Sequence, residues 1–313
     1  MTAVILDGKA TAEAIRREVA AGVAELVAAG GRSPGLAVVL VGDDPASQVY
    51  VGSKVRACEE VGMVSRSVRL PEDASADAVR RAIDELNADD AVDGYLVQLP
   101  LPGHLPEREL LARVDPDKDV DGFHAVNVGR LWLGEGGFAP ATPSGVIELL
   151  RRHRILLAGT RAVVVGRSNI VGKPMAALLL RENATVTVCH SRTRDLPAVC
   201  READVLVAAI GRPGFLGPDA VRERATVIDV GVNRLTERAD VERFFPGDGE
   251  RLASFERRGS VLIGDVDFAR VRETAGAITP VPGGVGPLTV AMLLVNTLEA
   301  ARRRQGLGAA AAR

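Results

Sequence analysis

The sequence predicts an α/β protein of two domains, each built on a parallel-type sheet flanked by helices. Its 313 residues suit two domains of roughly 100–200 residues each. A content of 47% hydrophobic and 26% charged residues is ordinary for a folded globular chain. Short β-branched runs alternate with helical patterns in two separate series, which is the pattern of α/β domains with parallel strands.

The first series has the order β-α-β-α-β, which requires right-handed crossovers. Its first helix ends at Gly30-Gly31, a typical C-cap signal, and Asp43-Asp44-Pro45 supplies an N-cap and a first-turn proline for the next helix. The apolar run Gly35–Val41 is typical of a buried parallel strand. The expected elements are helix 9–29, strand 35–41, helix 45–61, strand 64–70, helix 75–87 and strand 94–99.

A loop-rich stretch, 100–143, separates the two series and places the domain junction there. After the second series, a Pro/Gly loop leads into a last helix. The charged segment Arg234–Arg258 predicts an irregular surface insertion. The expected elements are helices 142–152, 172–182, 195–202 and 287–304, and strands 162–166, 184–189, 204–210, 225–230 and 261–264.

Charge and composition exclude several classes of protein. A formal net charge of −2 and a pI of about 6.2 give no electrostatic argument for binding nucleic acid or an anionic membrane. The apolar runs are too short for a membrane span, and the N-terminus lacks the pattern of a signal peptide. Three cysteines without a CxxC pair and four scattered histidines predict neither disulfides nor a metal site, which favours a reducing cytoplasm.

Lysine is rare in this chain: only four of the 39 basic residues are lysine. A lysine that persists against such a bias is expected where arginine would not serve, as a titratable amine or a compact charge. Four surface lysines by chance are the alternative. The four are Lys9, Lys54, Lys118 and Lys173.

The segment Val163–Pro174 carries the strongest pattern. A β-branched strand ends at Gly166, a polar loop follows, and Gly172 opens a helix. Such a turn lets the backbone approach a pyrophosphate and directs helix N–H groups at it, as in a dinucleotide-binding half. Only two glycines occur, six residues apart, so an ordinary tight turn between strand and helix is the alternative.

The end of the next strand indicates which dinucleotide binds. NAD sites usually place an acid there, against the ribose 2′-hydroxyl. Here the strand ends Cys189-His190-Ser191-Arg192-Thr193, with a hydroxyl and a guanidinium instead. Together with Arg167 these residues predict a pocket for a 2′-phosphate, because arginine binds phosphate with bidentate hydrogen bonds. NADP is therefore favoured over NAD, unless Arg192 is one of many surface arginines.

Tyr50 and Lys54 are spaced i, i+4 on a predicted helix, so their side chains share a face. A lysine beside a tyrosine can be held partly neutral and serve as a general base. The same spacing marks short-chain dehydrogenases, but there the tyrosine follows the nucleotide turn, whereas here it precedes it. A solvated pair on a helix surface is the other interpretation.

The loop Asp115–His124 holds four carboxylates within seven residues. Calcium is not expected, because the spacing is not that of an EF-hand. The alternative to a cation-binding loop is that one of these carboxylates faces an amidine-like heterocycle.

The loop Pro280–Thr289 is rich in proline and glycine. It predicts a rigid wall without side chains, against which a flat ligand could lie. A plain connection into the last helix is the alternative.

Five motifs occur in a fixed order along the chain. They are Tyr50-Val51-x-x-Lys54, Gln98–Pro102, Lys118–Phe123, Gly166–Pro174 and Pro282–Pro287. Together they closely resemble the bifunctional methylenetetrahydrofolate dehydrogenase/methenyltetrahydrofolate cyclohydrolase family, and the resemblance extends from Leu6 to Thr297.

The resemblance implies two α/β domains with a cleft between them, the second of them a Rossmann-type NADP-binding domain, and a cytoplasmic homodimer. The implied domains are 1–141, completed by the returning helix 287–304, and 142–280, with a frayed tail at 305–313. The implied reaction oxidises methylene-tetrahydrofolate to methenyl-tetrahydrofolate with NADP, then hydrolyses the product to formyl-tetrahydrofolate. Polyglutamylated folates are the expected substrates, with no nucleic acid or membrane partner.

The resemblance also implies roles for individual residues. Lys54 is the base of the hydrolysis, Gln98 tunes its amine, and Tyr50 stacks on the folate ring. Asp121 grips the pterin and completes the catalytic set. The further substrate contacts are Val97, Leu99, Pro100, Pro282, Gly283 and Gly284. The cofactor contacts are Gly166, Arg167, Ser168, Val171, Gly172, Ser191, Arg192, Thr193, Gly231, Val232 and Thr279.

Two other functions stay open on the sequence. An NADP oxidoreductase of the shikimate-dehydrogenase type has the same domain order, and a non-catalytic NADP-binding regulator would keep the nucleotide turn. Two departures from the family pattern also stand out. Ala141 occupies a position that is commonly cysteine, and the 234–258 insertion exceeds the usual hairpin, which makes it a candidate modulator of NADP binding or of the dimer surface.

Overall fold

The computed structural model describes residues 2–307, which form two compact units. Unit 1 takes in the chain up to Thr11 together with Thr142–Leu288, and unit 2 takes in Ala12–Ala141 and the chain from Thr289 onward. Residues 308–313 of the predicted tail lie outside the described residues. In the described part of that tail, the Gln305 side-chain oxygen accepts a hydrogen bond from the Arg32 N–H at 2.8 Å.

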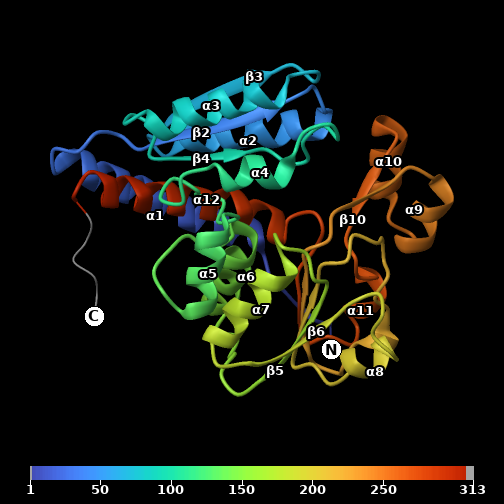
Figure 1. Cartoon of the computed structure of the whole chain (residues 1–313). Helices are drawn as coiled ribbons and strands as arrows, with labels where there is room; N and C mark the ends of the chain where they lie inside the picture. The colour runs from blue at the N-terminus through green and yellow to red at the C-terminus, as the bar shows by residue number, and fades with distance from the viewer. Residues whose placement is uncertain (1, 308–313) are drawn as a thin grey trace. The chain divides into compact units, whose positions relative to one another are not determined.

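Unit 2 is built on a three-stranded parallel sheet of order β3-β2-β4 (Figure 1). The chain passes from β2 to one neighbour and then crosses to the other, so right-handed connections place α2 and α3 on opposite faces. Ala37 and Val39 of β2 accordingly share a core cluster with Ile83 of α3. The elements are α1 (Gly8–Ala28), β2 (Gly35–Val41), α2 (Pro45–Glu60), β3 (Val64–Leu70), α3 (Ala76–Ala88), β4 (Gly94–Val97), α4 (Glu107–Ala112), α5 (Ala125–Leu133) and α12 (Val285–Arg304).

The stretch expected to be loop contains α4 and α5. It is organised by the buried carboxylate of Asp119, which accepts hydrogen bonds from the N–H groups of Gly122, Phe123 and His124 and from the Asn127 side chain. This carboxylate orders the segment that carries Asp121. Such a network joins residues through backbone groups, which is why no periodic pattern indicated it.

The last helix of the chain runs from Val285 to Arg304, and its residues from Thr289 belong to unit 2. Its Asn296 side chain donates to the carbonyls of Val120 and Ala139, at 2.8 and 3.1 Å. The helix therefore fixes the Asp119–Asp121 segment from a distant part of the sequence. Within residues 2–307, no helix has both the length and the apolar character needed to cross a bilayer.

Lys118 stabilises unit 2 from a fully buried position. Its amine donates to the carbonyls of Leu86 and Asp89, at 2.8 and 2.7 Å, where α3 ends. Burial lowers its pKa, and the nearby Arg304 adds to that effect. Arginine has no compact amine that would fit between these carbonyls. Lys118 therefore meets the expectation that lysine persists in this chain where arginine would not serve.

Replacing Lys118 with methionine is expected to lower the free energy of unfolding by about 2–5 kcal/mol, because two buried acceptors lose their donor. Urea unfolding, followed by circular dichroism, measures the change. Lys173→Met is the matched control, since that lysine is exposed and its amine donates to the exposed side chain of Asn169. Equal unfolding midpoints for the two variants would contradict the proposed role of Lys118.

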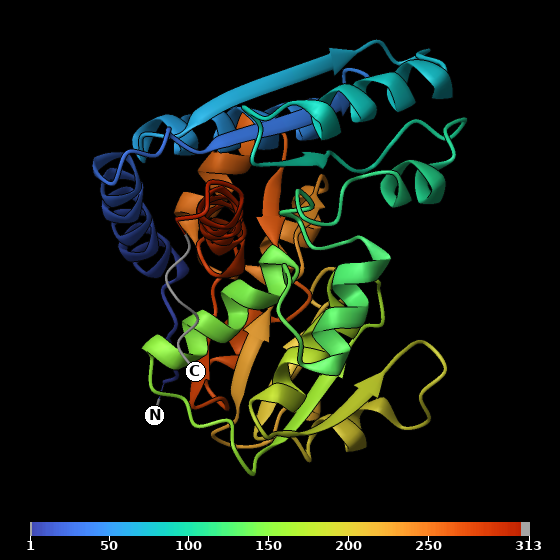
Figure 2. The ribbon, with the colours of Figure 1, turned by 60° about the vertical axis from the view of Figure 1, so that its left-hand side comes forward.

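Unit 1 is built on a six-stranded sheet, all parallel, of order β1-β11-β8-β7-β5-β6 (Figure 2). The chain adds β6 on one side of β5 and then crosses to add β7 on the other side. A switch point in the strand order therefore lies between β5 and β7. Open α/β sheets bind ligands at such a point, at the carboxyl ends of their strands. The order is a doubly wound 2-1-3-4-5 rather than the 3-2-1-4-5-6 of the standard Rossmann fold. The elements are β1 (Val4–Ile5), α6 (Ala141–Arg152), β5 (Arg161–Val165), α7 (Gly172–Arg181), β6 (Thr185–Cys189), α8 (Leu196–Cys200), β7 (Val205–Ala208), η1 (Pro218–Ala220), β8 (Thr226–Asp229), β9 (Asn233–Leu235), α9 (Arg238–Phe244), α10 (Gly249–Arg258), β10 (Val261–Ile263), α11 (Phe268–Val271) and β11 (Ala277–Ile278).

The N-terminal segment differs from its predicted assignment. Residues 1–11 were expected in the first domain, but β1 pairs in parallel with β11, with Val4 opposite Ala277. The pairing closes one edge of the unit 1 sheet. A two-residue strand whose partner lies far along the chain leaves no local signal in the sequence.

The insertion is also more ordered than expected. Strands β9 and β10 form an antiparallel pair, and α9 and α10 pack against it. Charged residues cover the outside and led to the prediction of an irregular segment. The cluster inside is apolar and consists of Leu235, Val241, Phe245, Val261 and Ile263, with Phe244, Leu252 and Phe255 packed against it.

Candidate active site

Lys54 and Gln98 meet in unit 2. Lys54 lies on α2, which follows β2 and begins at an N-cap, where Asp44 accepts from the Ser47 N–H at 2.7 Å. Gln98 directly follows β4, the strand next to β2. The Lys54 amine donates to Gln98 Oε1 at 2.9 Å, and Gln98 Nε2 donates to the Leu99 carbonyl at 2.8 Å. The second bond orients the amide so that its oxygen faces the lysine.

The electrostatics of this pair favour a neutral amine. Only 7% of Lys54 is exposed, and burial lowers the pKa of its amine, while Asp121 and Cys58 oppose the shift. Burial raises the pKa of the Asp121 carboxyl, and Lys54 counteracts that shift. The thiol of Cys58 is inert, because burial raises its pKa to about 12. Burial thus shifts the pKa values of Lys54 and Asp121 in opposite directions, and the attraction between the two groups opposes both shifts.

The remaining residues expected to bind substrate in unit 2 differ in exposure. Tyr50, one turn before Lys54, is 48% exposed, so its ring is open to solvent while the amine is buried. Pro100 is exposed, Leu99 is half-buried, and Val97 is buried in the core around α3. Tyr50 and Pro100 thus offer apolar surface, whereas Val97 acts from beneath it.

In unit 1, two glycines shape the turn after β5. Gly166 has φ +137°, and a Cβ there would lie 2.1 Å from the Ala209 carbonyl oxygen. A Cβ on Gly172 would lie 2.3 Å from the Gly166 oxygen. Only glycine fits at either position. The turn lies at the switch point between β5 and β7 and opens into α7 at Gly172, preceded by Val171.

The polar residues of these turns fall into two groups. The Ser168 hydroxyl oxygen accepts from the N–H groups of Val171 and Gly172, and the Thr193 hydroxyl oxygen accepts from the His190 N–H at 2.9 Å. These two hydroxyls order their own turns. Three exposed side chains have no hydrogen-bond or ion-pair partner among residues 2–307: Arg167, Ser191 and Arg192.

Two buried carboxylates, which the sequence analysis did not single out, hold the loops after β7 and β8. Asp265 accepts from the N–H groups of Ile210, Gly211 and Arg212 at 2.5, 3.0 and 2.8 Å, and from the Asn233 side chain at 2.9 Å. Asp229 accepts from the N–H groups of Gly231, Asp265 and Val266. Burial raises the pKa of Asp229 to about 7, an effect its hydrogen bonds oppose.

Three expected cofactor residues lie beside these carboxylates. A Cβ on Gly231 would lie 2.2 Å from Asp265 Cγ, so this glycine is required for packing. Thr279 is fully buried, and its hydroxyl oxygen accepts from the Asp229 N–H at 2.7 Å, which is a structural role. Val232 is exposed and offers apolar surface on the loop after β8.

The loop Pro282–Gly284 packs against Gly8 and Lys9, which also belong to unit 1. The Lys9 N–H donates to the Gly283 carbonyl at 3.1 Å, and a Cβ on Gly8 would lie 1.6 Å from the Gly284 oxygen. Gly283 has φ +102°. The loop is therefore a backbone surface held in one conformation, with few side chains to obstruct a flat ligand.

The chain is similar to known proteins over nearly its whole length. Residues 140–305 match the model of the tetrahydrofolate dehydrogenase/cyclohydrolase NAD(P)-binding domain, and residues 6–121 match that of the catalytic domain. The bifunctional protein FolD of Koribacter versatilis is 55% identical over 306 residues, which cover 98% of this chain and 99% of the relative.

Two solved structures are similar over nearly their full length. The FolD methylenetetrahydrofolate dehydrogenase/cyclohydrolase of Campylobacter jejuni has a TM-score of 0.87 at 45% identity, with 96% of this chain and 99% of that chain covered. The FolD enzyme of Trypanosoma brucei, solved with NADP cofactor and inhibitor, has a TM-score of 0.87 at 40% identity, with 97% and 98% covered.

Proposed function

The chain belongs to the tetrahydrofolate dehydrogenase/cyclohydrolase family, and on that premise we propose that Lys54 manages the proton of its hydrolytic reaction while Arg167 and Arg192 bind the 2′-phosphate of NADP. The enzyme is bifunctional. It oxidises methylene-tetrahydrofolate to methenyl-tetrahydrofolate with NADP, and it hydrolyses the methenyl compound to formyl-tetrahydrofolate. The relatives favour this function over a shikimate-type oxidoreductase or a regulator without turnover.

The bond between Lys54 and Gln98 carries the assignment of the hydrolysis. Water must lose a proton as it attacks the methenyl carbon, and a positioned base with a pKa near the working pH accepts it best. Burial moves the Lys54 pKa in that direction, and Gln98 Oε1 fixes the amine at 2.9 Å. Lys54 Nζ takes a proton as the water oxygen bonds to the methenyl carbon. One of the two carbon–nitrogen bonds then breaks as the carbon–oxygen bond becomes the formyl carbonyl, and the remaining hydroxyl proton passes to the nitrogen that leaves.

The other residues of unit 2 position the substrate. The exposed ring of Tyr50 is available to stack on a flat heterocycle, and Asp121 suits the amino and ring nitrogens of a pterin. Carried over from the family, the remaining substrate contacts that we propose are Val97, Leu99 and Pro100 of unit 2 and Pro282, Gly283 and Gly284 of unit 1. Hydride removal from the methylene carbon depends on orientation more than on proton transfer, so it makes smaller demands on Lys54.

The turns of unit 1 fit NADP, which supplies the hydride acceptor when bound. Gly166 and Gly172 let the turn before α7 pack closely on its own backbone and on Ala209. The N-terminus of α7, which this turn leads into, favours an anion such as a pyrophosphate. Arg167 and Arg192 have free guanidiniums among the described residues, and no acid stands where a 2′-hydroxyl would be bound. Ser168, Val171, Ser191, Thr193, Gly231, Val232 and Thr279 complete the cofactor contacts that we propose.

Arg192→Ala is expected to raise the KM for NADP roughly 10- to 100-fold, the value of a lost charge-assisted phosphate contact, and to leave the KM for NAD unchanged. Steady-state oxidation of methylene-tetrahydrofolate with each cofactor, with formyl product quantified, tests this together with the proposed function. Arg194→Ala is the control, since it removes a neighbouring exposed arginine. A parallel loss with NAD, or wild-type turnover with NAD alone, would refute the phosphate pocket.

We further propose that the enzyme is a cytoplasmic homodimer that accepts polyglutamylated folates. The resemblance to the family supports the dimer and the substrate. The three cysteines are free and buried, as fits a compartment that keeps thiols reduced. The folate chemistry that we assign to Lys54 belongs to unit 2, and the turns that we assign to NADP belong to unit 1.

A further inference from the structure

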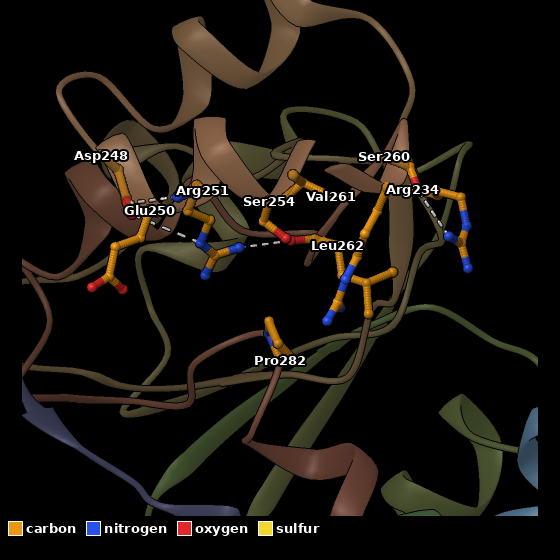
Figure 3. A pocket seen from close by; sticks show the side chains of 10 residues that line it. Arg234, Asp248, Glu250, Arg251, Ser254, Ser260, Val261, Leu262 and Pro282 are labelled. Carbon is orange, nitrogen blue, oxygen red and sulfur yellow. Dashed lines mark hydrogen bonds and ion pairs between the residues drawn. The ribbon is translucent and has the colours of Figure 1, made fainter. Parts of the chain in front are cut away.

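The insertion lines a pocket in unit 1, and of the residues given a role in the proposed function only Pro282 belongs to its lining. The pocket has a volume of about 480 Å³ and lies among α10, β10 and Pro282 (Figure 3). Three arginines line it, Arg234, Arg251 and Arg258, and we call it the arginine pocket. Its position connects the insertion to the loop that the family resemblance assigns to folate.

Arg251 builds the pocket. Its guanidinium donates to the carbonyls of Leu262 and Val281, at 2.8 and 3.0 Å, and stacks on Phe245 at 4.1 Å from the ring centre. Burial lowers its pKa, which shows how closely the surrounding groups pack around it. Arg251 therefore ties α10 to the residue before Pro282, and its donors are largely occupied.

Arg234 and Arg258 are free to bind a ligand. Arg234 donates to the Ser260 hydroxyl at 2.8 Å and faces no carboxylate partner, and Arg258 has no hydrogen bond or ion pair within residues 2–307. Both are exposed. Of the two acids in the lining, Asp248 is engaged as the N-cap of α10, and Glu250 lies on the side of the pocket away from Arg234 (Figure 3).

Two unpaired guanidiniums beside a hydroxyl recognise an anion with more than one charge, because each carboxylate or phosphate pairs with one arginine. The carboxylates of tetrahydrofolate are confined to its glutamate tail. Pro282 belongs both to the arginine pocket and to the loop Pro282–Gly284 proposed to contact the folate. We propose that the arginine pocket binds the free α-carboxylates of the γ-linked polyglutamate tail, an inference that rests on the proposed folate role of that loop.

The test compares methenyl-tetrahydrofolate carrying one or five glutamates as substrate of the hydrolysis, which needs no NADP. For the double variant Arg234→Ala/Arg258→Ala, the KM for the pentaglutamate is expected to rise about tenfold, and that for the monoglutamate to stay unchanged. The wild-type advantage of the pentaglutamate is expected to shrink with added salt, because both arginines are exposed. Arg257→Ala is the matched control, since Arg257 is the exposed neighbour of Arg258 on α10 and does not line the pocket.

Three results would overturn the proposal while the hydrolysis itself proceeds normally. The first is an unchanged pentaglutamate KM in the double variant, and the second is an equal effect of Arg257→Ala, which would indicate general surface charge. The third is competition by inorganic phosphate beyond that of chloride at equal ionic strength, which would make the pocket a phosphate site. Failure of the wild-type enzyme to hydrolyse either substrate would instead refute the proposed function, and this inference with it.

Discussion

Lys54→Gln is expected to slow methenyl-tetrahydrofolate hydrolysis by about 10²- to 10⁴-fold, the usual contribution of a positioned general base. Glutamine keeps the length and polarity of the side chain but offers no amine to take a proton. Hydride transfer to NADP needs no base, so the variant is expected to accumulate the methenyl product. Coupled measurement of NADPH, methenyl and formyl compounds in one reaction separates the two steps.

Two further variants sharpen this result. Lys54→Arg keeps the positive charge but does not titrate at any working pH, so it is expected to fail like the glutamine variant. Arg56→Gln, which removes an exposed cation from the same helix, is expected to leave both activities intact. Hydrolysis by Lys54→Arg at the wild-type rate would show that charge alone is needed and that Lys54 is no base.

Asp265→Asn is expected to impair the NADP-dependent oxidation and to spare the hydrolysis, which is the reverse of the pattern expected for Lys54→Gln. The buried carboxylate accepts hydrogen bonds from three backbone N–H groups of the loop after β7 and from the Asn233 side chain. Asparagine would place its own NH₂ group opposite two of these four donors, so those two hydrogen bonds would be lost. Leaving buried donors unsatisfied costs about 2–5 kcal/mol here. The KM for NADP is expected to rise roughly 10- to 100-fold. Methenyl hydrolysis is expected to persist, since Lys54 and Gln98 lie in unit 2.

Steady-state kinetics of both reactions, with thermal unfolding of each variant, measure this effect. Asn233→Ala removes a single bond to the carboxylate and is the milder companion, useful if Asp265→Asn folds poorly. It is expected to weaken NADP binding by a few-fold. If both variants fold and lower hydrolysis as much as dehydrogenation, then Asp265 does not act through the cofactor loops.

Most of the regular elements could be predicted from the sequence, because their signals are local. The buried strand Gly35–Val41, the cap at Asp44 and the turn from Gly166 to Gly172 each follow from neighbouring residues. Strand β1 could not, since its partner β11 lies at the other end of the chain. The helices of the insertion did carry a signal, with Val241, Phe244 and Phe245 at helical spacing, which the surrounding charges obscured.

The proposed site was predictable only in part, for a similar reason. Lys54 stood out because lysine is rare, and the structure adds its bond to Gln98, 44 residues away. Asp119 and Asp265 were missed because they act on backbone N–H groups, which every sequence contains. Lys118, equally rare, proved to be structural, so rarity marks a special environment rather than catalysis.

Burial is what makes the Lys54 amine a base in the proposed mechanism, and titration of that amine is the decisive measurement. With only four lysines in the chain, ¹³C-labelled lysine gives few side-chain NMR signals, and Lys54→Gln assigns the relevant one. We expect Lys54 to titrate with a pKa below the ordinary 10.5, and lower still in Asp121→Asn, because that carboxylate opposes the shift. A pKa of 10.5 or above would make Lys54 a permanent cation at working pH and contradict its role in the hydrolysis.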